Sequence, residues 1–254
     1  MAGNNNFQSL REFSQKVYKF QQEKSIFALD PHGEVNGGAI NHVVLPSDQF
    51  NLIKGGVCAS LTCAWLKEKQ TSGNSFRGNS AGGNIHTGKN LDTVAAAATY
   101  QIEYVSNFQK NSPIKLYGLK PLSYPDGNDV LVTKMTPFQR TTMSGYVERG
   151  FLREIEVLPS ILNACEREYL KMGRGVYVSF TLRSTIEGKQ GGGHAVGAYR
   201  SRGDKLYFFD SNCGVYHVAD PYSFFDAWIN CYKNIGYEVT INENNGNGFT
   251  YVKG

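Results

Sequence analysis

The sequence has no apolar run long enough to cross a membrane, since a spanning helix needs about 20 such residues. Its purest run, Val94 to Ala98, fits one face of a helix. No basic block is present either, because the formal net charge of +4 comes from both signs mixed along the chain. We therefore do not expect nucleic acid as a partner. The first residues, Met1 to Asn6, lack the charged and apolar regions of a conventional signal peptide, and glycine at the third position argues against N-myristoylation.

A disulfide framework is missing as well. The five cysteines are an odd number without regular spacing, which favours a reduced compartment. They are Cys58, Cys63, Cys165, Cys213 and Cys231. Cys213 and His217 form a C-x-x-x-H pair, but no second pair stands at a spacing suited to zinc, so we expect no metal and no cofactor. The glycines at 191–193 match neither phosphate-binding pattern.

The length of 254 residues, with 41% hydrophobic residues, suits one sizeable core and is short for two. We expect a single domain over residues 1–254. Helical spacing dominates the first half, beginning with a helix over Phe7 to Phe20, and strand patterns such as Val176 to Leu182 dominate the second. The predicted fold class is α+β with an antiparallel sheet. Two loops, Thr71–Gly88 and Arg183–Gln190, are expected to set substrate selectivity, and the second of them is expected to be flexible.

The stretch that stands out chemically begins at Gly55 and Gly56 and continues into Cys58. Leu61 and Trp65 follow at helical spacing, so Cys58 is predicted to lie in the first turn of a helix. Unpaired backbone N–H groups and the positive end of the helix dipole favour a thiolate there, as a nucleophile requires. Cys63 lies more than a turn further along and is the alternative nucleophile, although packing is its simpler role.

A base and an acid are predicted from a hairpin near the end of the chain. Gly191–Gly193 lead into His194 and a buried strand, and a second strand ends in Asp210. The hairpin could bring Asp210 beside His194, where a carboxylate would fix the imidazole tautomer and leave the other ring nitrogen facing the thiol. The glycines would allow a substrate to approach closely. His86 and Asp204 are the competing base and acid, but His86 lies in a polar loop and Asp204 at the hairpin turn.

Three motifs in this order resemble a known family. G-V-C-x-x-L-x-x-x-W, G-G-H-A-V-G and F-F-D-x-N-x-G are similar to motifs of the YopT/AvrPphB family of bacterial effector proteases, over about Ile53 to Tyr216. The resemblance implies a papain-like fold, in which a helical part carrying the nucleophile packs on an antiparallel sheet carrying the His and Asp. It also implies that Cys58 is the nucleophile, His194 the base and Asp210 the orienting acid.

The sequence departs from the papain-like pattern at the oxyanion donor. Papain-like enzymes use a side-chain amide a few residues before the nucleophile, and the five residues before Cys58 contain none. Asn51 is the candidate that we take forward, with Gln49 as a weaker one. The backbone N–H of Cys58 is the other natural donor.

The leading functional hypothesis is a thiol endopeptidase. The resemblance implies a monomeric effector or toxin that leaves a bacterium by an injection-type route and acts in the host cytoplasm. Its substrates would be specific host proteins, for example Rho-type GTPases near a lipidated tail at a membrane, or signalling kinases. The same triad could instead carry out glutamine deamidation, transglutamination or acyl transfer on a host protein, because these reactions share the acyl-enzyme. A binding module with an incidental triad is the non-enzymatic alternative.

Overall fold

The computed structural model describes residues 10–18, 22, 45–71, 89–107, 112–122, 151–152, 154–242 and 248–254. The helices are α1 (Leu10–Phe13), α3 (Ser47–Ile53), α4 (Cys58–Thr71), α5 (Lys89–Ser106), α6 (Pro113–Leu116), α9 (Glu154–Cys165) and α10 (Pro221–Asn234). The strands are β1 (Ser14–Tyr18), β2 (Lys120–Pro121), β3 (Phe151–Leu152), β4 (Arg174–Ser184), β5 (Gly192–Arg200), β6 (Leu206–Asp210), β7 (Gly214–Val218), β8 (Tyr237–Asn242) and β9 (Phe249–Lys253).

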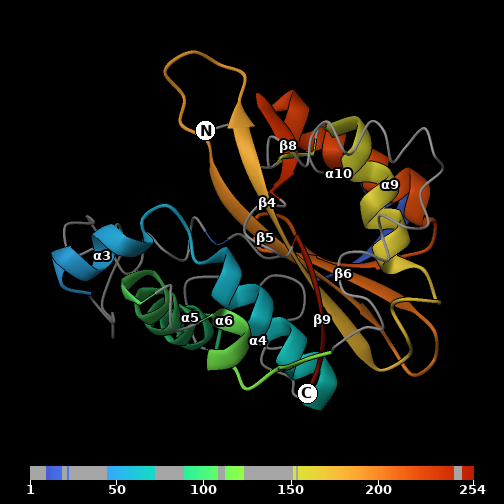
Figure 1. Cartoon of the computed structure of the whole chain (residues 1–254), viewed down its shortest axis with the longest axis horizontal. Helices are drawn as coiled ribbons and strands as arrows, with labels where there is room; N and C mark the ends of the chain where they lie inside the picture. Colours follow the sequence, from blue (N-terminus) through green and yellow to red (C-terminus); the bar gives the residue numbers. More distant parts are fainter. Residues whose placement is uncertain are drawn as a thin grey trace.

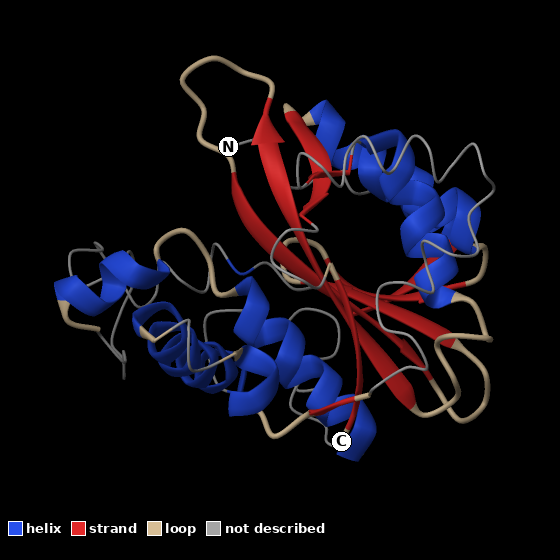
Figure 2. Ribbon diagram, viewed as in Figure 1, coloured by secondary structure: helices blue, strands red, loops and turns tan. Residues whose placement is uncertain are grey.

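The described residues form an antiparallel sheet with helices packed against it (Figures 1 and 2). The strands follow the order β1-β7-β6-β5-β4-β8-β3, and β9 pairs with both β4 and β2. Every pairing is antiparallel. The long hairpin of β4 and β5 forms the centre, with Phe180 opposite His194. β6 lies on the other side of β5, with Asp210 opposite Val196. The expected antiparallel sheet is confirmed.

Helices cover both faces of this sheet, so the described residues form two large hydrophobic cores, one on each face, where the length favoured a single one. One core lies between the sheet and the pair α9 and α10, and its largest buried side chains include Trp228, Phe208 and Phe224. The other lies between the sheet and α4, α5 and α6, and is centred on Trp65. Figure 1 shows the two helical groups on opposite sides of β4, β5 and β6. The strands between them are therefore buried on both sides.

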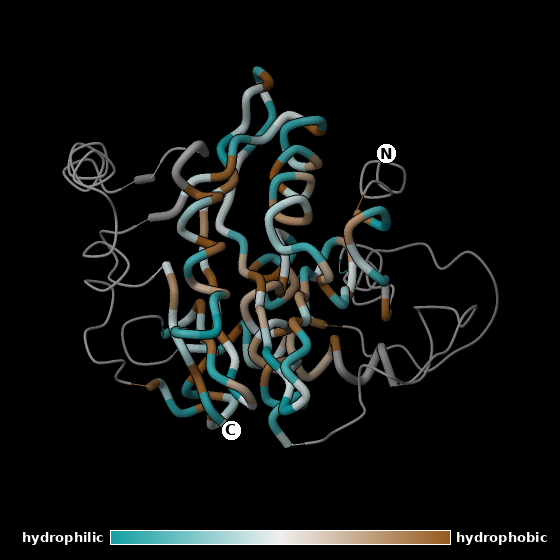
Figure 3. Tube along the Cα trace, turned by 90° about the vertical axis from the view of Figure 1, so that its right-hand side faces the viewer, coloured by the Kyte–Doolittle hydropathy of each residue, from teal (hydrophilic) through white to brown (hydrophobic). Residues whose placement is uncertain are grey.

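The helices of the described part alternate between hydrophilic and hydrophobic residues along their turns (Figure 3). This pattern is typical of helices that pack one face on a core. α10 is an example, because Phe225, Trp228 and Tyr232 are buried while Tyr222 is exposed. Among the described residues, no helix has both the length and the hydropathy needed to span a bilayer.

The helix predicted over Phe7 to Phe20 is largely wrong within the described residues. α1 ends at Phe13, and Ser14–Tyr18 form strand β1, which pairs with β7. The apolar residues do follow helical spacing, but the free edge of β7 offers backbone hydrogen bonds that a short isolated helix cannot match. Tertiary pairing has overridden the local pattern here.

Several predicted elements fall outside the described residues, including nearly all of the loop Thr71–Gly88. The other predicted loop, Arg183–Gln190, is described, and it is not a free excursion. β4 continues to Ser184, and Thr185 N–H donates to Gly236 O over 3.0 Å. The Nζ of Lys189 lies 4.0 Å from the centroid of the Tyr237 ring. These contacts attach the loop to β8, which corrects the expectation of a flexible loop.

The contact between α4 and β5 brings the two halves of the candidate site together. Thr62 Oγ1 donates to Ala195 O over 3.1 Å, and the Trp65 ring stacks on Phe209 with centroids 5.4 Å apart. Gly197 makes this approach possible, because a Cβ at that position would lie 3.1 Å from both Thr62 Cγ2 and the Trp65 ring. The absence of a side chain at residue 197 thus sets the distance between helix and sheet.

Gly197→Ala should therefore lower the free energy of unfolding by about 1–3 kcal/mol, as overpacking of a close-packed contact does. Trp65 is fully buried and has little freedom to move aside. Denaturant titration of this variant beside Gly203→Ala, whose added methyl would contact only Ser201 Oγ at 3.9 Å, measures the effect. Equal stability of the two variants would contradict the assigned role of Gly197.

Candidate active site

Cys58 is the first residue of α4, as predicted from the glycines before it. Gly56 has a φ of +128°, a conformation that favours glycine and that turns the chain from α3 into α4. Cys58 is 8% exposed and packs beside Ala59 and Ala195. Its position at the helix start places the thiol near the positive end of the helix dipole.

His194 and Asp210 are in direct contact. His194 Nε2 lies 2.9 Å from Asp210 Oδ1, and both side chains are buried. The pair comes from neighbouring strands, β5 and β6, which is the hairpin geometry expected from the sequence. Because a carboxylate can only accept, Nε2 of His194 carries the proton in this contact.

Asp210 is held by four hydrogen bonds although it is fully buried. Oδ1 accepts from His194 and from the backbone N–H of Asn212 over 2.8 Å. Oδ2 accepts from Trp228 Nε1 over 2.9 Å and from Tyr232 OH over 2.8 Å. Burial alone would raise the pKa of this carboxyl, but the charge of His194 and the hydrogen bonds from His194, Asn212 and Trp228 lower it below its usual range. Asp210 is thus a fixed negative charge.

The imidazole of His194 is influenced from two sides. Burial by itself would lower its pKa, but the charges of Asp210 and Cys58, together with hydrogen bonds to both, raise the pKa of His194 to about 10. Phe180 contacts the ring edge-on with centroids 5.2 Å apart, and the Tyr232 ring lies 5.9 Å away. The protonated imidazole is therefore favoured at neutral pH, held between aromatic rings and a carboxylate.

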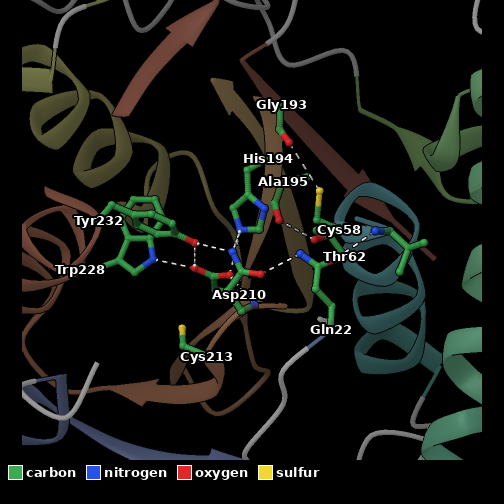
Figure 4. Close-up of polar contacts among 12 residues, drawn as sticks. Gln22, Cys58, Thr62, Gly193, His194, Ala195, Asp210, Cys213, Trp228 and Tyr232 are labelled. Carbon is green, nitrogen blue, oxygen red and sulfur yellow. Dashed lines mark hydrogen bonds and ion pairs between the residues drawn. The ribbon is translucent and has the colours of Figure 1, made fainter. Parts of the chain in front are cut away.

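Figure 4 shows His194 between Asp210 on one side and Cys58 on the other. The Cys58 thiol lies 4.0 Å from Gly193 O, the carbonyl just before the histidine. Since Nε2 is engaged by Asp210, the other ring nitrogen, Nδ1, remains for the thiol. The structure therefore brings together Cys58, His194 and Asp210, the three side chains that the motifs single out.

Gln22 is a fourth polar side chain at this place, and the sequence analysis did not find it. It is 6% exposed, and its Oε1 accepts from the backbone N–H of Val57 over 3.0 Å. Its Nε2 donates to Asn212 Oδ1 over 2.7 Å. A Cβ on Gly56 would lie 3.3 Å from Gln22 Oε1, so glycine also makes room for this amide. Gln22 thus lies beside the start of α4.

The backbone N–H groups at the start of α4 differ in whether a described side chain binds them. The N–H of Val57 is bound by Gln22, and the N–H of Ser60 donates to Gln101 Oε1 over 3.3 Å. No described residue accepts from the backbone N–H of Cys58 in any hydrogen bond found outside the helices and strands themselves. This N–H belongs to the residue after Val57, to which the Gln22 amide is bound, so both groups lie at the start of α4. Backbone N–H groups and side-chain amides are the donors that bind an oxygen anion in enzymes.

Asn51 does not take part in this arrangement. It lies in α3 with an exposed side chain, and its Oδ1 accepts from Lys54 Nζ over 3.2 Å. Gln49, the weaker candidate, is exposed on the same helix. The prediction considers only residues just before Cys58 in the sequence, whereas the amide that lies beside the start of α4 belongs to residue 22. The backbone N–H of Cys58 remains a candidate donor.

The competing candidates lie elsewhere or are unsuited. Cys63 is fully buried, and burial raises its pKa well above the usual thiol range. Asp204 occupies the hairpin turn with a φ of 61°, bound to Arg167 over 2.6 Å and to Arg200 over 3.1 Å. His86 lies outside the described residues.

The described residues contain no group of three or more His, Cys, Asp or Glu side chains that could hold a metal ion. Cys213 is buried, and the ring of His217 lies 5.4 Å from that of Tyr207.

The glycines before His194 have different structural roles. A Cβ on Gly191 would lie 2.3 Å from the carbonyl oxygen of Leu182, so a side chain is excluded there. A Cβ on Gly192 or Gly193 would meet no atom within 4 Å. Both residues are exposed, Gly193 lies beside the Cys58 thiol, and packing against the described residues does not explain either glycine. They leave an open surface next to the thiol.

No protein-family model matches the chain, and no curated protein matches it. Among solved structures, the Pseudomonas avirulence protein AvrPphB is similar, with a TM-score of 0.40 and 12% identical residues. The similarity covers 80% of this chain and 94% of that chain.

Proposed function

We propose that this protein is a papain-like thiol endopeptidase with Cys58 as nucleophile, His194 as general acid and base, and Asp210 as the residue that orients His194. The observation that carries the proposal is the buried contact between His194 and Asp210 beside a thiol at a helix start. A buried pair with raised and lowered pKa values in this arrangement is typical of a catalytic site.

The chemistry follows from the position of each group. The Cys58 thiolate attacks the carbonyl carbon of the scissile peptide bond and forms a tetrahedral intermediate. Protonated His194 gives its Nδ1 proton to the leaving amine as the C–N bond breaks, which leaves an acyl-enzyme. His194 then takes a proton from water, the hydroxide attacks the thioester, and Cys58 leaves as the thiolate. Asp210 keeps the Nε2 proton in place throughout.

We assign the oxyanion site to the backbone N–H of Cys58 and the side-chain amide of Gln22. Negative charge develops on the carbonyl oxygen of the substrate, and donors fixed in advance stabilise it. The open surface at Gly192 and Gly193 lies next to the thiol and would receive the substrate backbone. The expectation of a host protein substrate reached by injection rests on the motif resemblance and stays a prediction.

Thiol labelling tests this proposal. Iodoacetamide at neutral pH should modify Cys58 selectively in the native wild type and much more slowly in His194→Ala, because only the thiolate reacts and the imidazolium stabilises it. Peptide mapping by mass spectrometry identifies the labelled cysteine. Uniform slow labelling that does not depend on His194 would refute the proposed pair. If the pair is active, product masses separate hydrolysis from deamidation or acyl transfer, since only hydrolysis of the chain yields two fragments.

A further inference from the structure

We infer that Asn212 is a positioning residue that fixes the orientation of the Gln22 amide and so aligns the oxyanion donor with the His194–Asp210 pair. The inference deepens the proposed function and rests on it. Asn212 is the asparagine of the F-F-D-x-N segment, and neither step of the proposed reaction uses it. Its side chain lies between the residues that the reaction does use.

A chain of hydrogen bonds crosses the site through this residue. Gln22 Nε2 donates to Asn212 Oδ1 over 2.7 Å, and Asn212 Nδ2 donates to Tyr232 OH over 3.0 Å. Tyr232 OH donates in turn to Asp210 Oδ2 over 2.8 Å. The backbone N–H of Asn212 also donates to Asp210 Oδ1 over 2.8 Å. Asn212 is therefore connected to Asp210 directly through its backbone N–H and indirectly through Tyr232. Its side chain is also hydrogen-bonded to Gln22, the candidate oxyanion donor.

The direction of this chain is fixed at both ends. The backbone N–H of Val57 can only donate, so it requires the oxygen of Gln22, and the nitrogen of Gln22 must face Asn212. Ionised Asp210 can only accept, so the hydroxyl of Tyr232 must donate to it and accept from Asn212. Both requirements select the same orientation of the Asn212 amide. In the reversed orientation, Asn212 Nδ2 would face the donor Gln22 Nε2, and Asn212 Oδ1 would face the accepting oxygen of Tyr232.

The fixed orientation has a chemical consequence at Gln22. Its amide has two N–H groups, and one of them is bound to Asn212. No described residue accepts a hydrogen bond from the second N–H of Gln22. The Gln22 amide lies beside the start of α4. A rotated amide would present an oxygen to the developing oxyanion and repel it. Asn212 therefore ensures that Gln22 presents a donor.

Asn212 does not act through a hydrogen bond to the histidine. Its Nδ2 lies 3.4 Å from His194 Nε2, but Nε2 already donates its proton to Asp210, so the two groups are both donors. Its removal should consequently leave the thiolate–imidazolium pair in place. Activation of the nucleophile and stabilisation of the oxyanion can then be measured separately.

Two reagents make this separation. Iodoacetamide reports the reactivity of the thiolate and forms no oxyanion, whereas a peptide aldehyde forms a hemithioacetal whose oxygen occupies the oxyanion site. In Asn212→Ala, Cys58 labelling should stay within about twofold of the wild type, while aldehyde affinity and kcat fall about tenfold at little change in KM. Gln22→Ala should show the same pattern, and the double variant should lose little more, since both changes remove one donor. Asn230→Ala, which affects an exposed contact with Asp226, is the matched control.

Tyr232→Phe interrupts the same chain one step further on and keeps the ring, so it covers the case in which Asn212→Ala does not fold. It should weaken aldehyde binding in the same direction by a smaller factor. Unchanged aldehyde affinity in folded Asn212→Ala, or in Tyr232→Phe, would overturn the inference, as would additive losses in the double variant. If wild-type labelling does not depend on His194, the proposed peptidase itself fails. That result is distinct from a failure of the role of Asn212 alone.

Discussion

Cys58→Ala should abolish peptide cleavage, with kcat/KM falling by about a thousandfold or more, because the proposed acyl-enzyme forms on the Cys58 sulfur. The fold should be unaffected, since Cys58 belongs to a small cluster with Ala59 and Ala195 and removal of its sulfur opens little space. Hydrolysis of a peptide library, followed by mass spectrometry, measures the loss.

Cys63→Ala is the matched control for this change. It alters the same helix by the same atoms, but its sulfur lies in the core of the α4 side, remote from solvent. We expect a modest loss of stability and near-normal kcat/KM. Cleavage that persists in Cys58→Ala and disappears in Cys63→Ala would reverse the assignment of the nucleophile.

Asp210→Asn should lower kcat by about a hundredfold or more, because it removes the charge that fixes His194. All four hydrogen bonds to Asp210 come from donors, so the amide nitrogen of asparagine must face at least one of them. If the amide nitrogen faces His194, it donates to Nε2, and the imidazole proton shifts to Nδ1. The ring nitrogen on the Cys58 side then cannot accept a proton from the thiol. Steady-state kinetics at neutral pH measures the effect.

The same variant should change the pH profile. The pKa of His194 is raised to about 10 in the folded protein. The protonated imidazole therefore stabilises the folded state fully below about pH 6.5, and this stabilisation is lost as the pH rises through about 10. The upper limb of kcat/KM should accordingly lie near pH 10 in the wild type. In Asp210→Asn it should move to lower pH, because the charge of Asp210 helps to raise this pKa.

Asp204→Asn is the control for the acid. It makes the same chemical change on the same hairpin, and asparagine tolerates the left-handed backbone that residue 204 adopts. It weakens contacts with Arg167 and Arg200 at the turn and does not reach His194. A loss of activity equal to that of Asp210→Asn would show that the hairpin as a whole, rather than the charge beside His194, is responsible.

The sequence predicts those parts of the site whose geometry depends on residues close to one another in the sequence. Glycines before an apolar helix position Cys58, and two strands joined by a short turn bring Asp210 to His194. Each inference needs only one local rule and a short turn. The strand predicted over Val176 to Leu182 follows from an equally local pattern and lies within β4.

Contacts between distant segments could not be predicted in this way. Gln22 stands in a polar run with nothing to mark it, and its role depends on Val57, Gly56 and Asn212. Helical spacing favours a helix where β1 lies, and the pairing with β7, about 200 residues away in the sequence, cannot be predicted from that spacing. Trp228 and Tyr232 offered a weak signal, since they are four residues apart on one helix face and their polar tips need buried partners.

The hydrogen bond between Gln22 and Asn212 joins residues 190 positions apart, and the contact between Cys58 and Gly193 spans 135 positions. Closing loops of this length is a late and slow step in folding. A chain with only its local helices and hairpins formed would bring neither the nucleophile nor the Gln22 amide to the strand that carries His194. On the proposed function, activity should consequently appear only with the last cooperative step of folding, in which these distant segments come together.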